Sequence, residues 1–335
     1  MGMNVSDLAQ LTYMNTILSS QRNEMNTLED QISSGEKAST YAGLGGADTI
    51  TTISLQSSLS QINAYSSNIS LLQGRTSVMD NALTSITTTS QQVVADLQGV
   101  TQSDTDPGMA NFNVEAQNAL NQIQSALNSQ YNGVQVFAGT DSATPPVASV
   151  ATLNTNVTAV LANLYNGTQN GATVLTNVQA ITGTNAGYSA SVGSAGPVTA
   201  QIDTNQTINY TVMANDPSLQ QVMQGLSIIA NLQYDPNHPS DFWTVYNGAI
   251  NMIKQGSTGV TSLDSKVGLV QDQLNTADTT HQATQTTLQT QLGSVDDVDV
   301  AQATTQLTLL QTQLQASYRV VSMVNQLSLV NFLPT

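Results

Sequence analysis

The stretch VAQATTQLTLLQTQLQASYRVVSMV, residues 300–324, carries apolar side chains at alternating steps of three and four residues. This spacing places them on one face of an α-helix, in the heptad pattern of coiled coils. A single helix cannot cover such a face, so we expect a partner helix. The face comprises Val300, Ala303, Leu307, Leu310, Leu314, Val321 and Val324, with Ser317 as its polar member.

A second heptad pattern lies near the N-terminus, where Leu11 and Leu18 begin a series at steps of seven residues. Gly35 follows the series as a helix C-cap signal. Packing the two terminal helices together covers both apolar faces, so we predict a terminal coiled-coil domain from residues 1–40 and 297–335. Its predicted seam residues are Leu11, Met14, Leu18, Met25, Leu28, Ile32, Leu307, Leu310, Leu314, Val321, Val324 and Leu327.

The segment 315–333 raises the question of a membrane helix, because Arg319 is its only charged residue. A spanning helix needs about 20 mostly apolar residues. Asn325, Gln326 and Asn331 would instead leave amides without partners in hydrocarbon. We therefore predict no membrane insertion and expect this apolar face to meet protein.

The longest heptad pattern predicts a helix over residues 49–100, with Asp48 as its N-cap. A further pattern over residues 260–292 supplies the partner of this helix. We therefore predict a helical rod domain from residues 41–140 and 216–296, in which the outgoing and returning chain pack side by side.

Turn and strand signals interrupt the helical pattern in the middle of the chain. The segment VTAQIDTNQTINYTVMAN, residues 198–215, alternates and is rich in Thr, Val and Ile, as a pair of strands would be. We predict a β-rich variable insertion domain at residues 141–215. The boundary signals are Asp106-Pro107 and Asp216-Pro217 as helix starts and Asn132-Gly133 as a turn.

Together these patterns predict a mainly α fold. It is an elongated rod of long coiled-coil-like helices, formed by the N- and C-terminal halves, with a small β-containing insertion at the tip. Aromatic residues make up only 4% of the chain, which favours thin layers of helices over a thick globular core.

The charge balance excludes several classes of function. The net charge is −16 and the six Lys and Arg residues are scattered, whereas nucleic-acid binding needs clustered cations. Cysteine is absent, which rules out disulfides and Cys-based metal sites. We therefore expect no nucleic-acid partner.

Few residues offer the chemistry of an active site. His238 and His281 are too few for a metal site or a triad, and the acidic group at residues 296–299 lacks the further ligands of a calcium loop. We expect Asp297 or Asp299 to cap a helix instead. The sequence therefore predicts no enzyme, no cofactor and no metal.

Three motifs resemble those of the flagellin superfamily and, within it, the branch found at the hook-filament junction. QISSGEKAST with YAGLGGAD, residues 31–48, is similar to the end of the family's first helix and the turn after it. YNGVQVFAGT, residues 131–140, resembles the turn and Phe-Ala-Gly strand of that branch, here Phe137, Ala138 and Gly139. The C-terminal LQASYRVVSMVNQLSLVNFL resembles the family's last helix.

The resemblance implies a structural protein of the bacterial flagellum that joins hook to filament by helical self-assembly. It implies that the seam residues form an assembly interface with other copies, with hook-associated proteins and with flagellin. It also implies an export chaperone, an extracellular location and type III export. The N-terminal residues lack the pattern of a cleaved signal peptide, which fits such export.

Two alternatives remain open at this point. The first is a filament flagellin, which the Phe-Ala-Gly motif disfavours. The second is a cell-surface adhesin or glycan-binding flagellin homologue that uses the insertion. That function calls for a cluster of exposed aromatic residues, and the insertion offers only Tyr165, Tyr188 and Tyr210.

Overall fold

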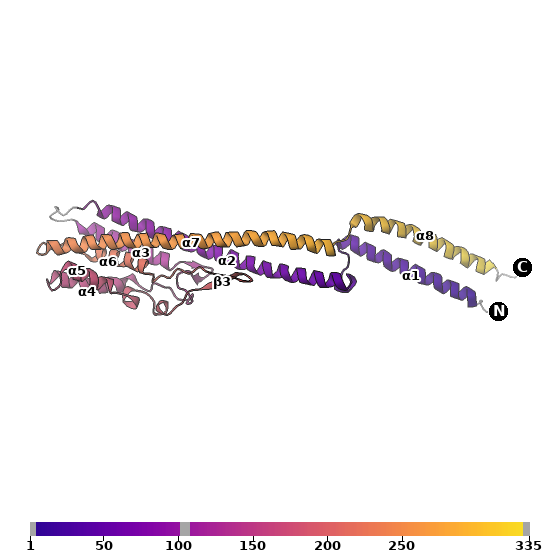
Figure 1. The fold of residues 1–335 in the computed structure, drawn as a ribbon, viewed down its shortest axis with the longest axis horizontal. Coiled ribbons are helices and arrows are strands. Elements are labelled where there is room, and N and C mark those ends of the chain that lie inside the picture. The colour runs from indigo at the N-terminus through magenta and orange to yellow at the C-terminus, as the bar shows by residue number, and fades with distance from the viewer. Residues whose placement is uncertain (1–4, 101–107, 331–335) are drawn as a thin grey trace. The chain divides into compact units, whose positions relative to one another are not determined.

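A computed structural model describes residues 5–100 and 108–330 (Figure 1). It divides into a terminal unit, made of residues up to Ile62 and from Gln282 onward, and a central unit over Asn63–His281. The helices are α1 (Val5–Ser34), α2 (Gly46–Leu97), α3 (Met109–Leu127), α4 (Val150–Tyr165), α5 (Gly171–Gln179), α6 (Pro217–Asn231), α7 (Pro239–Asp296) and α8 (Val300–Val330). The strands are β1 (Gln130–Tyr131), β2 (Val134–Gln135), β3 (Thr199–Asp203) and β4 (Gln206–Asn209).

In the terminal unit, α1 and α8 lie side by side (Figure 1), and we call them the terminal pair. Gly35 ends α1 with a positive φ of 80°, as predicted, because a residue without Cβ adopts this conformation at little cost. Asp299 caps α8, since its Oδ1 accepts hydrogen bonds from the backbone N–H groups of Ala301 and Gln302, both at 3.0 Å. The predicted pairing of the two end helices is confirmed.

In the central unit, α2 and α7 run antiparallel. Gln73 donates to Asn275 at 2.8 Å, and Tyr246 Oη donates to the carbonyl of Leu97 at 2.7 Å. Every position of the predicted heptad series from residue 69 to 97 is buried. These positions are Ile69, Leu72, Thr76, Met79, Leu83, Ile86, Ser90, Val93 and Leu97.

The helix starts were predicted with mixed success. Asp216 caps α6, because its Oδ1 accepts from Ser218 N at 2.9 Å and Pro217 is the first helical residue. Asp48, predicted as an N-cap, instead lies in the first turn of α2, which begins at Gly46. A carboxylate there still favours the positive end of the helix dipole. The predicted start at residues 106–107 lies outside the described residues.

The predicted turn at Asn132-Gly133 and the predicted strand pair in residues 198–215 are both present. β1 and β2 pair around Asn132 and Gly133, whose φ angles of 52° and 76° suit a two-residue hairpin turn. β3 and β4 form a second antiparallel sheet of two strands within residues 198–215. The mainly α fold with a small β-containing insertion is therefore confirmed.

The insertion is more helical than predicted. Residues 141–215 contain α4 and α5 as well as the β3–β4 hairpin, so this segment is mixed rather than β-rich. The buried face of α4 repeats at steps of three and four residues, which is a helical period. That face comprises Val150, Leu153, Val157, Leu161 and Leu164.

The start of α7 is anchored by aromatic packing. Phe242 and Trp243 are buried, and their rings meet edge to face with centroids 5.2 Å apart. Tyr246 stacks on Phe242 at 5.9 Å. Aromatic residues are few in this chain, and three of them bury their rings together in the first turns of α7.

Two carboxyl pairs link α2 to neighbouring helices in the central unit. Burial raises the pKa of Glu115 on α3 to about 7, and a hydrogen bond to Asp96 and the charge of that carboxylate add to the rise. Burial likewise raises the pKa of Asp264 on α7 to about 6, assisted by Asp80. Each pair is more stable with one carboxyl group protonated than with both ionised, because two neighbouring carboxylates repel each other.

We expect the central unit to become less stable as pH rises from 5 to 8. Folding raises the pKa of Glu115 from 4.5 to about 7 and the pKa of Asp264 from 3.8 to about 6. Each group therefore contributes its full stabilisation when the pH is below its ordinary pKa. That stabilisation is lost as the pH rises through the pKa of the folded state. After allowance for solvent screening, the loss is about 1 kcal/mol. Folding lowers the pKa values of three other carboxyl groups, those of Asp96, Asp141 and Asp235. These groups lose their contribution to stability only below pH 5, so they do not affect the change between pH 5 and 8.

Thermal unfolding between pH 5 and pH 8 measures this effect. The double variant Glu115→Gln, Asp264→Asn should flatten the pH dependence. Asp272→Asn on α7 is the matched control, because it removes one exposed carboxylate outside both pairs. An unchanged slope in the double variant would contradict the assignment.

Candidate assembly surface

The seam of the terminal pair is short and thin. Leu28, Ala303 and Leu310 form a cluster in which each side chain is at most 7% exposed. Leu18 and Leu314 are also buried, at 8% and 9% exposure. The alternating spacing places these side chains between the two helices, as the heptad pattern requires.

The other predicted seam residues are less completely covered. Met25, Ile32 and Leu307 are partly buried against the cluster. Val298, which was not among the predicted seam residues, is partly buried there too. Met14 and Val321 are half-buried. The side chains of Leu11, Val324 and Leu327 lie outside the described residues. The seam therefore exists within one chain, and its role as an assembly interface stays a prediction.

A cation also joins the two helices. Arg22 on α1 donates from Nε to Tyr318 Oη at 2.7 Å and from its terminal nitrogen to the same oxygen. Its guanidinium lies 5.5 Å from the centre of the Tyr318 ring. Arg22 is the only basic residue in α1, but nothing in the sequence pattern predicted its partner. The contact joins α1 to α8 at one point along the terminal pair.

Lys37, in the turn after α1, caps the end of α7. Its backbone N–H donates to Asp296 O at 2.7 Å, and its ammonium donates to Ser294 O at 3.1 Å and Val295 O at 2.6 Å. These are three of the last four carbonyls of α7, which a helix leaves without partners. A positive charge also suits this end of a helix. The bonds hold the turn after α1 against the turn before α8.

Large apolar side chains remain exposed on the terminal pair. Seven of them are between 38% and 69% exposed, and scattered single residues would be unremarkable on a protein surface. Here they lie on two paired helices with few charges, which makes a surface suited to pack against more protein. They are Tyr13, Ile17, Val300, Leu309, Tyr318, Val320 and Met323. The placement of Val300 on the covered heptad face was therefore wrong, since it lies at the first residue of α8 and is 45% exposed.

We expect the terminal pair to open readily in a dilute monomer. Its thin seam covers little apolar area, and helices of this length are marginal without tertiary packing. Backbone amides of α1 and α8 should exchange hydrogen about 100-fold faster than those of α2 beyond Ile69, where the core is deep. Hydrogen exchange with mass spectrometry measures the difference, and equal protection would count against the prediction.

The Phe-Ala-Gly motif lies in the central unit and not on this surface. Phe137 and Ala138 are fully buried, and Phe137 O accepts from Ala214 N at 2.9 Å. Gly139 has a φ of 61°, and a Cβ there would stand 2.6 Å from Gly196 O. The motif therefore packs the segment before the insertion against the insertion, which is a structural role.

The histidines have structural partners. His238 Nδ1 lies 2.7 Å from Asp235 Oδ2, and His281 Nε2 lies 2.7 Å from the carbonyl of Ile202, with its ring stacked on Tyr65. Within the described residues, no three His, Cys, Asp or Glu side chains gather as metal ligands. None of the described helices is long and apolar enough to cross a membrane.

Comparison with known proteins gives two family matches at the two ends of the chain. Residues 5–142 match the bacterial flagellin N-terminal helical region, and residues 250–333 match the bacterial flagellin C-terminal helical region. Together these matches span more than half of the chain. A search of curated protein sequences gives no significant match.

Comparison with solved structures gives two similar chains, of which the first supports the fold. One from Vibrio parahaemolyticus, described as a flagellar hook-associated protein, has a TM-score of 0.55 and 16% identity, and the alignment covers 75% of this chain and 98% of that one. The structure of FlgL from Bacillus cereus has a TM-score of 0.46 and 15% identity, with 70% and 97% covered. The structure from Vibrio parahaemolyticus therefore shares its fold with this chain.

Proposed function

Because the chain belongs to the flagellin-like superfamily and is a structural protein of the flagellum, we propose that it joins hook to filament. In this role it most resembles hook-associated protein 3. The observation that supports self-assembly is the set of exposed apolar side chains on the terminal pair, such as Tyr13, which the seam within one chain leaves in water. The Phe-Ala-Gly motif favours the junction over the filament.

The proposed partners follow from this role. They are other copies of the chain in a helical lattice, adjoining hook-associated and flagellin subunits, and an export chaperone that covers the apolar helices before assembly. As a flagellar component, the protein is placed outside the cell. We further propose that it leaves through the flagellar type III channel without a cleaved signal.

A filament flagellin is the alternative, and the adhesin class has less support. Tyr188 and Tyr210 in the insertion are 3% and 5% exposed. Tyr165 is half-buried, and its Oη accepts a hydrogen bond from Gln233 N–H at 2.8 Å. A glycan site needs aromatic faces that a sugar can reach. The insertion therefore lacks the surface that this alternative requires.

Electron microscopy of flagella from a deletion strain tests the proposal. Intact hooks without filaments fit a junction protein. Filaments that persist in shortened or altered form fit a filament flagellin, and normal flagella with lost surface binding fit an adhesin. Complementation with the intact gene should restore filaments in the first case.

A further inference from the structure

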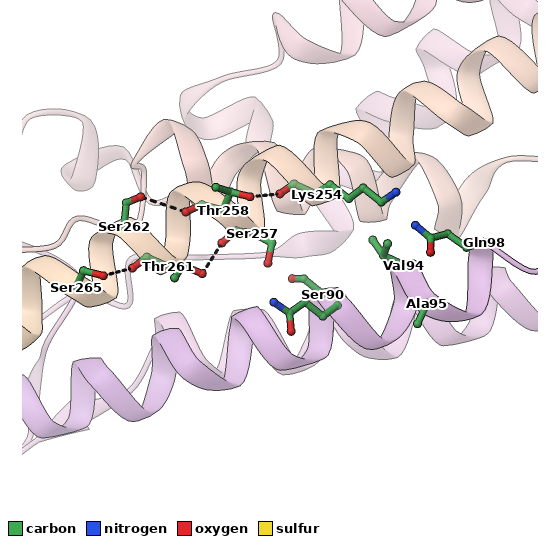
Figure 2. A pocket seen from close by; sticks show the side chains of 11 residues that line it. Ser90, Val94, Ala95, Gln98, Lys254, Ser257, Thr258, Thr261, Ser262 and Ser265 are labelled. Atoms are coloured by element: carbon green, nitrogen blue, oxygen red, sulfur yellow. Dashed lines mark hydrogen bonds between the residues drawn. The ribbon is translucent and has the colours of Figure 1, made fainter.

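A polar groove runs between α2 and α7 in the central unit (Figure 2). Several of its hydroxyls bond within α7, where Thr258 donates to Lys254 O and Thr261 donates to Ser257 O. Its described lining contains no His, Asp or Glu that could activate a hydroxyl. The reactive position that we identify lies instead in the hairpin of β1 and β2.

The sequence contains four Asn-Gly pairs. In such a pair the glycine nitrogen can attack the side-chain carbonyl carbon of the asparagine, because a glycine has no Cβ to hinder the approach. Three of the pairs follow a tyrosine, so their local sequence is the same and the fold decides how they differ. The pairs are Asn132-Gly133, Asn166-Gly167, Asn170-Gly171 and Asn247-Gly248, and the first, second and fourth follow tyrosine.

In three of the pairs the glycine N–H is held in a hydrogen bond. Gly167 N donates to Leu164 O at 3.0 Å, and Gly171 N donates to Asp241 Oδ1 at 2.8 Å. Gly248 lies inside α7, where each backbone N–H bonds to the carbonyl four residues earlier. A nitrogen held in this way must first break its bond before it can turn toward the neighbouring side chain.

The glycine of the remaining pair has a free N–H. Gly133 N makes no hydrogen bond with any described residue, and neither does the side chain of Asn132. Both residues are exposed, and a Cβ on Gly133 would meet nothing within 4 Å. Water and the asparagine side chain can therefore both reach this nitrogen.

We propose that Asn132 is a site of spontaneous covalent modification, at which the folded protein converts asparagine to aspartate and isoaspartate. Gly133 N loses its proton and bonds to Cγ of Asn132, the Cγ–Nδ2 bond breaks, and the amide nitrogen takes up a proton and leaves as ammonia. Water then opens the resulting succinimide ring at either of its two carbonyl carbons. The co-reactant is water alone, and the inference does not depend on the proposed function.

The isoaspartate product changes the hairpin. Its backbone runs through the side-chain carbons, which adds one atom to a turn of only two residues between Tyr131 and Val134. Both turn residues have positive φ, and a longer backbone cannot keep this tight geometry. The ring of Tyr131 packs against Gly74 on α2 and leaves no room there for a Cβ. The modification should therefore loosen the contact of the hairpin with α2.

Ageing of the purified full-length chain tests the proposal. The fresh protein is kept in a warm, mildly alkaline buffer, which favours loss of the glycine proton, and samples are taken over several weeks. Pepsin is used for digestion, because the chain has no Lys or Arg between Arg75 and Lys254. Mass spectrometry should show that Asn132 converts at least about 10-fold faster than Asn166 or Asn247.

Two controls separate the fold from the sequence. In guanidinium chloride the three Tyr-Asn-Gly sites should convert at similar rates, because their hydrogen bonds are lost. The variant Asn132→Asp carries the charge of the product without the added backbone atom. Hydrogen exchange over Gln130–Gln135 should therefore rise in the aged wild type and stay slow in the fresh variant.

Each outcome decides the matter. If Asn166 or Asn247 converts as fast as Asn132 in the folded chain, the free N–H does not select the site and the proposal is overturned. If the three sites convert in guanidinium chloride but none converts in the folded chain, the turn protects Asn132 and the proposal also fails. Conversion without a change in hydrogen exchange would overturn the inferred effect on the hairpin.

Discussion

Leu314→Asp is expected to leave cells without filaments while the variant is still made and exported. Leu314 is 9% exposed in the seam of the terminal pair. An aspartate there puts a carboxylate without a partner into a dry interface, which costs at least about 3 kcal/mol. The terminal pair is thin, so we expect this cost to exceed what holds α1 and α8 together.

The variant should damage assembly more than folding. The core of the central unit contains no residue of the terminal pair, so its helices have their own support. Far-ultraviolet circular dichroism of the monomer should therefore lose at most the contribution of α1 and α8. Secretion into the medium should stay near normal, and motility should be lost.

Gln313→Asp is the matched control for Leu314→Asp. Gln313 is the exposed neighbour on the same turn of α8, so it tests the effect of an aspartate in this helix without burying it. The control should retain motility. Normal motility in Leu314→Asp would end the idea that this seam drives assembly. A globally unfolded monomer would show that the terminal pair stabilises the whole subunit.

The long helices could be predicted because their burial repeats with the heptad. Thr76 and Ser90 show the strength of this signal, since both are polar yet fully buried at positions that the period assigned to the core. Each hydroxyl donates to the carbonyl four residues earlier, Leu72 and Ile86, which satisfies it inside the helix. At these two positions the heptad period alone therefore predicted burial, although the side chains are polar.

Shorter elements and long-range contacts could not be predicted in this way. α4 has only 16 residues, and its helical spacing was missed because the strand pattern of residues 198–215 was taken to describe the whole insertion. The contacts of Arg22 with Tyr318 and of Lys37 with the end of α7 join residues more than 250 positions apart. They depend on the relative register of paired helices, which no local pattern records.

Gly139→Ala is expected to destabilise the central unit by about 3 kcal/mol. Gly139 has a φ of 61°, a conformation that costs residues with a Cβ about 1–2 kcal/mol. The added Cβ would also lie 2.6 Å from both Gly196 O and Met213 Sδ. The methionine side chain can move, but the carbonyl belongs to a backbone that Thr140 N already binds at 3.1 Å.

Gly133→Ala separates the two costs. Gly133 also has a positive φ, 76°, but a Cβ there would meet nothing within 4 Å, so this variant carries the backbone strain alone. Chemical denaturation of both variants should place the loss for Gly139→Ala well above that for Gly133→Ala. Equal losses would show that strain explains both. In that case the Phe-Ala-Gly segment would not depend on close packing against the loop at Gly196.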